Sequence, residues 1–377
     1  MRASRWAVGS IFFTNGVLYA TYVSRIPDIQ QHYMLDYRGV GFVLLTGAIG
    51  SLVAMPFTGG LIARWGSKWV TLLASFSFCL SVALFMLSPT AGILAFIFFL
   101  KGVVAGITDV AMNAQAVLVE RAFQRPIMAA FHGLFSLGMF AGAGAGTFFI
   151  SLGVGVFTHM WIIAAGGFLF VISLSQYLIR EDLKISLEKI RKTKYFTVPA
   201  PSLFGIGIIA FCAMLAEGAM ADWSTNFMRE VVEALPSVAP AGLSAFSLAM
   251  LVGRFSGDRA RIFFGDQKLI NICSLLAIIG VGMIISGSLI FIVIAGFFLA
   301  GLGLSVIVPI AYSRAGNTPD IDPGTGISMV TTIGYSGFIV GPPTIGYLAD
   351  WKGLQIAYGF VLILLVCMYF VNRLKTS

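Results

Sequence analysis

The stretch that decides the fold runs from Leu100 to Arg121 and reads LKGVVAGITDVAMNAQAVLVER. It has the apolar, glycine-spaced character of a membrane helix, yet Lys101 and Asp109 lie well inside it. A charge near the centre of a bilayer costs about 2.5–3.5 kcal/mol on insertion scales, so such residues usually face a bundle interior or a water-filled cavity. The two charges are about 12 Å apart along a helix axis, too far for an easy direct pair. The stretch therefore indicates a membrane helix whose polar side chains have a function, although Lys101 could equally contact a neighbouring helix.

The composition of the whole chain supports a membrane protein. Of its 377 residues, 58% are hydrophobic and 11% charged, against about 25% charged residues in an ordinary soluble domain. The mean hydropathy is +0.93. The net charge of +8 does not require a nucleic-acid partner, because Lys and Arg collect in the cytoplasmic loops of membrane proteins. We therefore expect the lipid bilayer, and not nucleic acid, as the partner of the chain.

A spanning helix needs about 20 mostly apolar residues, and the sequence contains twelve such candidates. They lie near residues 6–24, 39–63, 69–88, 91–119, 127–152, 157–179, 202–228, 239–260, 268–287, 289–314, 325–350 and 353–373. Between the sixth and seventh spans the charged segment REDLKISLEKIRKTKYFTVPAP runs from Arg180 to Pro201. The sequence thus predicts an all-α membrane protein with an N-terminal six-helix bundle at 1–179, a cytoplasmic linker at 180–201 and a C-terminal six-helix bundle at 202–377.

The distribution of basic residues predicts the orientation. With the N-terminus inside, the outer loops receive only Arg25, Arg38, Arg229 and Lys352, Lys101 lies within a span, and the remaining Lys and Arg residues fall on the cytoplasmic side. This asymmetry follows the rule that cytoplasmic loops are positively charged. We expect a multi-pass protein of the bacterial inner membrane, with both termini cytoplasmic.

The two halves also resemble each other. A shift of roughly 200 residues places Phe135-Ser136 over Tyr335-Ser336 and Gly146 over Gly346, and weak internal symmetry of this kind marks several transporter folds. Each match is weak by itself. Together with the linker, they predict two pseudo-symmetric bundles.

The loop after the second span reads Gly59-Gly-Leu-Ile-Ala-Arg-Trp-Gly-Ser-Lys68 and resembles the G-x-x-x-D-R-x-G-x-K loop of the major facilitator superfamily. It departs from that pattern at Ala63, where the family usually has Asp. The related Gly253-Arg-Phe-Ser-Gly-Asp-Arg259 keeps its acid at Asp258. The resemblance implies that these loops act as latches during conformational change, with Arg64, Lys68, Asp258, Arg259 and His132 as gating candidates. Positive-inside topology accounts for Lys68 equally well.

Six further stretches are similar to a bacterial branch of the superfamily related to fucose permease, of the YbjJ type. They are Ser24-Arg-Ile-Pro-Asp28, Thr108-Asp-Val-Ala-Met-Asn113, Val119-Glu-Arg121, His132-Gly-Leu-Phe-Ser-Leu-Gly138, Ala216-Glu-Gly-Ala-Met-Ala-Asp-Trp223 and Gly341-Pro-Pro-Thr-Ile-Gly346. The resemblance implies a secondary transporter of a small organic solute, working as a monomer. Drug antiporters of the superfamily usually carry G-P-x-x-G-G in the fifth helix, and this chain has Gly138-Met-Phe-Ala-Gly-Ala-Gly-Ala-Gly146 there, without proline.

Spans 1, 4, 7 and 10 resemble the cavity walls of that fold, so their polar residues, with one from span 11, are the substrate-binding candidates. These are Asn15, Tyr19, Tyr22, Lys101, Asp109, Asn113, Glu217, Trp223, Asn226, Tyr312 and Tyr335. Trp223 could stack on a sugar face or belong to the aromatic belt at the membrane interface. A cavity with tyrosines, a tryptophan and amides suits a neutral polyhydroxylated solute such as a sugar.

Three carboxyl groups are candidates for proton coupling: Glu217 first, then Asp109 and Asp222. A carboxyl group taken out of water binds a proton more readily, because its charged form loses hydration. A structural hydrogen bond to a neighbouring helix is the other interpretation of Glu217. Arg254 is expected to extend to the cytoplasmic face, and Arg25 and Asp28 to be interface and helix-end residues.

Two other classes of protein are disfavoured. An enzyme would show clustered metal ligands or a Ser/His/Asp constellation, and a receptor would need a large soluble module. The sequence has no metal-ligand spacing and no GxxxxGK[ST] loop for ATP. We predict a proton-coupled secondary transporter without metal or cofactor, with proton-antiport export of cationic amphiphiles as the alternative.

Overall fold

The structure is a computed structural model that describes residues 2–124, 127–180, 201–287, 289–319, 321 and 323–374. The described chain divides into two compact units. The first comprises Met1–Leu35 and Phe42–Lys194, and the second Asp36–Gly41 and Tyr195–Ser377. Of the segment predicted as a linker, residues 181–200 lie outside the described residues.

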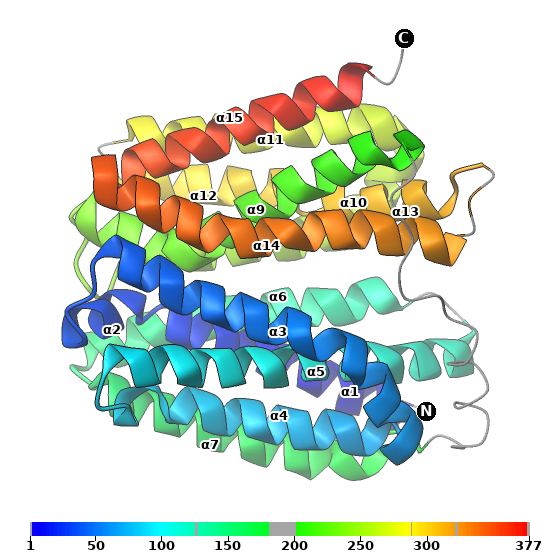
Figure 1. Cartoon of the computed structure of the whole chain (residues 1–377), viewed down its shortest axis with the longest axis horizontal. Helices are drawn as coiled ribbons and strands as arrows, with labels where there is room; N and C mark the ends of the chain where they lie inside the picture. Colours follow the sequence, from blue (N-terminus) through cyan, green and yellow to red (C-terminus); the bar gives the residue numbers. More distant parts are fainter. Residues whose placement is uncertain are drawn as a thin grey trace. The chain divides into compact units, whose positions relative to one another are not determined.

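The first unit is a bundle of membrane-length helices joined by short connections (Figure 1). Its helices are α1 (Arg2–Val23), α2 (Ile26–His32), α3 (Tyr37–Trp65), α4 (Ser67–Ala83), α5 (Ala91–Phe123), α6 (Met128–Ser151) and α7 (Val156–Leu174). Two 3₁₀ turns, η1 (Phe85–Leu87) and η2 (Ser175–Tyr177), follow α4 and α7. The short helix α2 was not predicted; it begins where Pro27 stands in its first turn, a position at which proline is tolerated.

Among the described residues, the second unit repeats this architecture with two differences: it has no counterpart of α2, and one of its spans is broken. Its helices are α9 (Pro201–Glu230), α10 (Ala241–Phe264), α11 (Asp266–Ser286), α12 (Ile290–Leu304), α13 (Ile307–Gly316), α14 (Pro323–Lys352) and α15 (Leu354–Leu374). The sequence predicts one span near 289–314, whereas the structure breaks it into α12 and α13 between Leu304 and Ile307. The break precedes Pro309, which lies in the first turn of α13 and has no N–H to donate to the Ser305 carbonyl. Mean hydropathy does not reveal it, because the residues on both sides of the break are mostly apolar.

The predicted all-helical fold is confirmed. Each of the twelve predicted spans coincides with a described helix, or with the pair α12 and α13 in the tenth case. Eight segments in the described part of the chain are long and apolar enough to cross a membrane. Of the remaining spans, α4 is short at 17 residues, and α10 carries four charged residues in its second half.

The same pairing of helices recurs in both units. In the first unit, α1 packs against α6 and α7, and α4 packs against α5 and α7. In the second, α9 packs against α14 and α15, and α11 packs against α12 and α15. If the spans of each unit are numbered one to six, span 1 packs against spans 5 and 6, and span 3 packs against spans 4 and 6, in both units. Each unit is therefore built on one packing scheme.

Glycines allow the closest of these contacts. A Cβ atom at Gly138 of α6 would overlap the carbonyl oxygen of Phe13 on α1, and one at Gly102 of α5 would overlap the carbonyl oxygen of Gly47 on α3. In the second unit, Gly280 and Gly296 bring α11 and α12 together in the same manner. Small residues at these crossings let helix backbones approach in a membrane, where no hydrophobic effect drives helices together.

Gly138 and Gly144 offer a matched test on one helix. Gly138→Ala is expected to destabilise the protein by about 1–3 kcal/mol, because the new methyl group forces α1 and α6 apart. A Cβ atom at Gly144 would meet no neighbouring helix within 4 Å, and this residue lies on an exposed face, so Gly144→Ala should be neutral or slightly stabilising. Thermal unfolding of the purified variants in detergent measures both; equal loss in the two variants would contradict the packing argument.

Candidate functional site

An ion pair between two helices is the central feature of the second unit. Arg254 of α10 donates from an NH2 group to Oε1 of Glu217 on α9, at 3.1 Å. The side chains are 18% and 24% exposed, respectively. Both residues lie inside membrane-length helices, where a single ionised group without a partner is costly. The pair satisfies both charges at once.

This pair corrects the expectation for Arg254. Its guanidinium does not extend to the end of the helix but bonds to the carboxylate of Glu217. The signal in the sequence was a charge within an apolar run, the same signal that singled out Lys101 and Asp109. The expected hydrogen bond from Glu217 to a neighbouring helix is present, and its partner is a cation.

In the first unit, Lys101 lies among aromatic rings. Its ammonium donates to the hydroxyl oxygen of Tyr22 at 3.1 Å and lies 4.5 Å from the centre of that ring and 5.3 Å from the ring of Phe98. Tyr22 also meets Tyr19 edge to face at 5.3 Å. Cation–π attraction and the hydroxyl group together stabilise a buried ammonium. Lys101 thus contacts a neighbouring helix, which was one of the two expectations for it.

Asp109 and Asn113 lie on one face of α5, as their spacing predicts. The Asn113 amide donates to the backbone carbonyl of Asp109 at 2.8 Å and to its carboxylate at 3.3 Å. Asn15 of α1 donates to the sulfur of Met112 at 3.5 Å, which places it against the same helix. These predicted polar residues therefore lie on α1 and α5 of one unit.

The other predicted residues of the second unit have different surroundings. Trp223 is fully buried, and its indole N–H has no hydrogen-bond partner among the described residues. Asn226 is buried and donates to Glu230 at 3.4 Å. In this structure Trp223 is therefore covered by its own unit, and both interpretations of it, stacking on a solute and a place in the aromatic belt, stay predictions.

Three further predicted residues of the second unit are partly buried. The Tyr312 hydroxyl donates to the sulfur of Met214 at 3.7 Å, and Tyr335 meets Phe338 edge to face. Asp222 acts electrostatically on the Tyr358 hydroxyl. Each thus interacts with a side chain of its own unit.

The gating candidates divide into buried and exposed residues. Lys68 is buried and donates to the backbone carbonyl of Gln176 at 3.3 Å, and His132 packs edge to face on Phe12. The remaining three are exposed: Arg64, Asp258 and Arg259. Within its unit, Lys68 therefore holds the segment that follows α7.

Gln115, a polar residue of the Leu100–Arg121 stretch that was not among the site candidates, makes three side-chain hydrogen bonds. Its amide nitrogen donates to Ser67 Oγ at 2.6 Å and to the Ile179 carbonyl at 2.8 Å, while its oxygen accepts from the Ile179 N–H at 3.0 Å. Gln115 is fully buried. The position of this amide inside an apolar run is the feature of the sequence that could have identified Gln115 as a hydrogen-bonding residue.

Arg25 is also more deeply placed than expected. It is 4% exposed and donates to His159 Nδ1 at 3.1 Å, to Asp28 at 3.1 Å and to the Val154 carbonyl at 2.7 Å. Arg25 lies between the end of α1 and the start of α2, which agrees with the helix-end position expected for it. It ties the connection between α1 and α2 to the connection between α6 and α7.

Comparison with known proteins identifies the family. The sequence profile of the Major Facilitator Superfamily matches residues 8–311. The chain belongs to this superfamily. Transporters of this superfamily are membrane proteins that move solutes and are not enzymes, and a small-molecule solute follows for this chain as well.

Relatives over nearly the whole length agree. An MFS-type transporter of Yersinia pestis is 36% identical over 355 residues, covering 94% of this chain and 91% of that protein. The membrane protein MosC of Rhizobium meliloti is 32% identical over 94% of this chain and 86% of its own. The chain is thus a multi-pass membrane transporter of a bacterial type.

Solved structures share the fold at low sequence identity. The nucleoside transporter NupG superposes with a TM-score of 0.78 at 12% identity, covering 100% of both chains. A bacterial homologue of the human lysosomal transporter Spinster superposes with a TM-score of 0.71 at 14% identity, over 98% of this chain and 96% of that one. These likenesses confirm the fold of this MFS transporter.

The ion pair of the second unit predicts a non-additive response to mutation. Arg254→Ala should destabilise the protein by about 1.5–3 kcal/mol, because the Glu217 carboxyl group loses its charged hydrogen-bond partner and must stay ionised or take up a proton at a cost. Adding Glu217→Ala to that variant should restore part of the stability, since no unpaired charge remains.

Thermal unfolding of the two single variants and the double variant in detergent gives the coupling energy, which contacting residues usually show. Additive losses would contradict a direct pair. Arg259→Ala, at an exposed site of the same helix, is the control and should change stability little.

Proposed function

We propose that this MFS transporter is proton-coupled and carries a small, neutral, polyhydroxylated solute such as a sugar by alternating access. The observation that carries the proposal is the pair of Glu217 and Arg254 at 3.1 Å inside the second unit. We further propose that the transporter is a monomer in the bacterial inner membrane, with both termini cytoplasmic and with the linker at 180–201 joining two six-helix bundles.

The pair has the chemistry of a proton-dependent switch. A carboxyl group beside a guanidinium holds its negative charge, whereas a carboxyl group removed from water without a partner takes up a proton. Protonation of Glu217 would remove the attraction that holds Arg254 to it. Conversely, movement of α9 against α10 would separate the two groups and favour proton uptake. Proton binding and helix movement are thereby coupled in both directions, as linkage requires.

The solute class follows from the balance of charge. The acidity of Glu217 is offset by Arg254, and Lys101 adds a cation in the first unit. Asp109 is the other acid among the substrate-binding candidates, and its carboxylate accepts a hydrogen bond from Asn113. The remaining polar groups are tyrosine hydroxyl groups, amides and a tryptophan indole, and these suit hydroxyl groups of a solute. A site with its acid already paired offers less to a cationic amphiphile, so export of such compounds by proton antiport is the second candidate.

Proton flux in proteoliposomes tests the proposal. Sugars, polyols, nucleosides and lipophilic cations are added in turn to vesicles that contain a pH-sensitive dye, with the wild type and with Glu217→Gln. We expect solute-dependent acidification of the vesicle lumen with a polyhydroxylated solute and its loss in Glu217→Gln, because the amide cannot take up a proton. Glu233→Gln, at an exposed position after α9, is the control and should transport normally.

The other outcomes are informative about each part of the proposal. Normal flux in Glu217→Gln together with loss in Asp109→Asn would move the coupling group to α5. Proton movement opposite in sign and driven only by lipophilic cations would establish the antiport alternative. Uptake of labelled solute without any proton movement would reject proton coupling altogether.

A further inference from the structure

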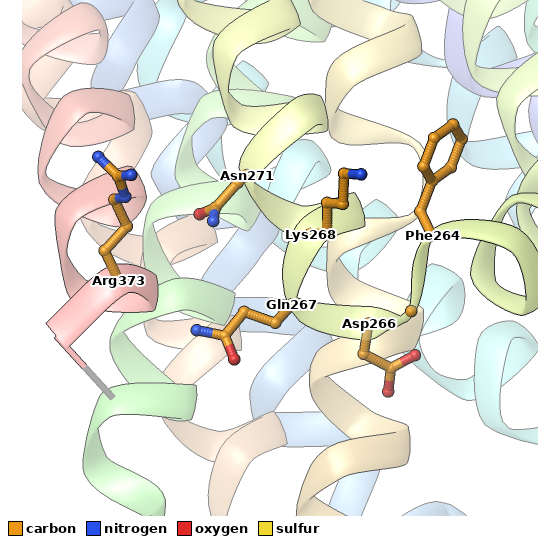
Figure 2. Close-up of a pocket in the computed structure, with 7 residues that line it drawn as sticks. Phe264, Asp266, Gln267, Lys268, Asn271 and Arg373 are labelled. Carbon is orange, nitrogen blue, oxygen red and sulfur yellow. The ribbon is translucent and has the colours of Figure 1, made fainter. Parts of the chain in front are cut away.

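A pocket at one end of the second unit lies outside every group discussed so far. It has a volume of about 530 Å³ and is lined by Phe264, Gly265, Asp266, Gln267, Lys268, Asn271 and Arg373 (Figure 2). Its walls are the end of α10, the first turns of α11 and the last turn of α15. By the distribution of basic residues, this is the end of the bundle expected at the cytoplasmic membrane interface.

The lining of the pocket carries two cations and one acid. In Figure 2 the Lys268 and Arg373 side chains extend in the same direction from two different helices, with Asn271 between them, and Asp266 extends in the opposite direction. The carboxylate of Asp266 accepts two hydrogen bonds from Arg261, at 2.8 and 3.0 Å. Its charge is thus neutralised by a residue outside the lining. Asp258, which also acts electrostatically on Arg261, does not line the pocket.

Both cations of the lining lie against aromatic rings. The Lys268 ammonium lies 5.7 Å from the Phe264 ring, and among the described residues it forms no ion pair. The Arg373 guanidinium lies 5.4 Å from the Tyr369 ring. Two cations in the lining of a pocket, with the only acidic residue of that lining neutralised by Arg261, provide a positive potential for an anion.

The pocket is held in shape by a buried network behind it. Asn372 is fully buried and exchanges hydrogen bonds with Gln267, each backbone carbonyl accepting from the other side chain at 3.1 Å. It also donates to Asn271 Oδ1 at 2.9 Å and accepts from Arg314 at 3.1 Å. The last turn of α15 is therefore fixed against the first turn of α11. Since Arg373 follows Asn372 directly, its backbone is positioned relative to Lys268 before any ligand binds.

Exposed apolar side chains flank this basic pocket. Ile262 and Phe263, at the end of α10 next to Phe264, are 88% and 82% exposed. On a helix end at the membrane interface, such side chains insert among acyl chains. Phosphate groups beside acyl chains belong to phospholipids, and basic pockets between membrane helices are suited to anionic headgroups.

We infer that this pocket binds the headgroup of an anionic phospholipid, with the phosphodiester between Lys268 and Arg373 and the acyl chains along Ile262 and Phe263. The ligand chemistry is a phosphate ester. The apolar flank favours a lipid over a soluble phosphate compound. The binding site is separate from the Glu217–Arg254 pair and does not depend on the proposed transport reaction.

The experiment uses the full chain purified in a mild detergent and titrated with phosphatidylglycerol, phosphatidylcholine or glycerol 3-phosphate. Native mass spectrometry counts bound lipid, and thermal unfolding gives the stabilisation. We expect wild type to bind phosphatidylglycerol in preference to phosphatidylcholine. The double variant Lys268→Gln/Arg373→Gln should bind phosphatidylglycerol about tenfold or more weakly, because it loses two cations near the headgroup.

The control is Arg121→Gln/Lys352→Gln, which removes the same charge at exposed sites away from the pocket. Lys352 also lies beside an aromatic ring, 5.5 Å from Trp351, so it matches Lys268 in surroundings. This control should bind phosphatidylglycerol as the wild type does. Lipid-free melting temperatures and elution volumes verify folding, and the single variants replace the double variant if it is unstable.

Three results would overturn the inference. Equal binding of phosphatidylglycerol by wild type and the pocket variant would show that the pocket is not the site. Equal loss in the control would show a general effect of net charge. Binding of glycerol 3-phosphate as tightly as phosphatidylglycerol would assign the pocket to a soluble phosphate compound.

Discussion

An ionised side chain inside a membrane bundle must have a partner, and this constraint shapes both units of the transporter. The two units stabilise their buried charges in different ways. The second unit pairs Glu217 with Arg254 across two helices, while the first unit gives Lys101 a hydroxyl group and aromatic faces. Protonation of a carboxylate removes its negative charge and so its attraction for a cation. An aromatic ring is not neutralised in this way. The two solutions therefore differ in their response to protons: protonation of Glu217 would release Arg254, whereas a proton would not neutralise the aromatic rings that lie against the Lys101 ammonium.

Close backbone contact is the second condition of the fold. Where helices cross at Gly138, Gly102 and Gly280, a side chain would have to displace backbone atoms. These crossings fix the helices of each unit at short distance, so the positions of the polar side chains are set by the backbone. Without a hydrophobic force between helices in lipid, this packing and the polar pairs carry the association. The close packing of the helix backbones thus determines both the arrangement of the helices and the positions of the polar side chains.

The sequence predicted the helices well because length and hydropathy are local properties. It also identified Asp109 and Asn113 as neighbours, since a spacing of four residues fixes a shared face. It did not predict the partner of Glu217, because the contact with Arg254 depends on how two helices are set against each other. The break between α12 and α13 was missed for another reason: Pro309, which has no N–H to donate to the Ser305 carbonyl, marks it, but the surrounding run is apolar enough to be taken as one span. The burial of Trp223 and Arg25 likewise depends on tertiary packing, which periodicity does not contain.

The hydrogen bonds of Gln115 have a mechanical consequence. Because its amide pairs with both the N–H and the carbonyl of Ile179, much as a neighbouring strand would, the chain leaving the first unit is anchored at that point. Tension along the chain from the second unit would be delivered to α5 and, through Ser67, to α4. This tension would therefore not act directly on the end of α7. The chain that leaves the first unit is therefore held by a residue in the interior of that unit, Gln115, and not by the end of α7 alone.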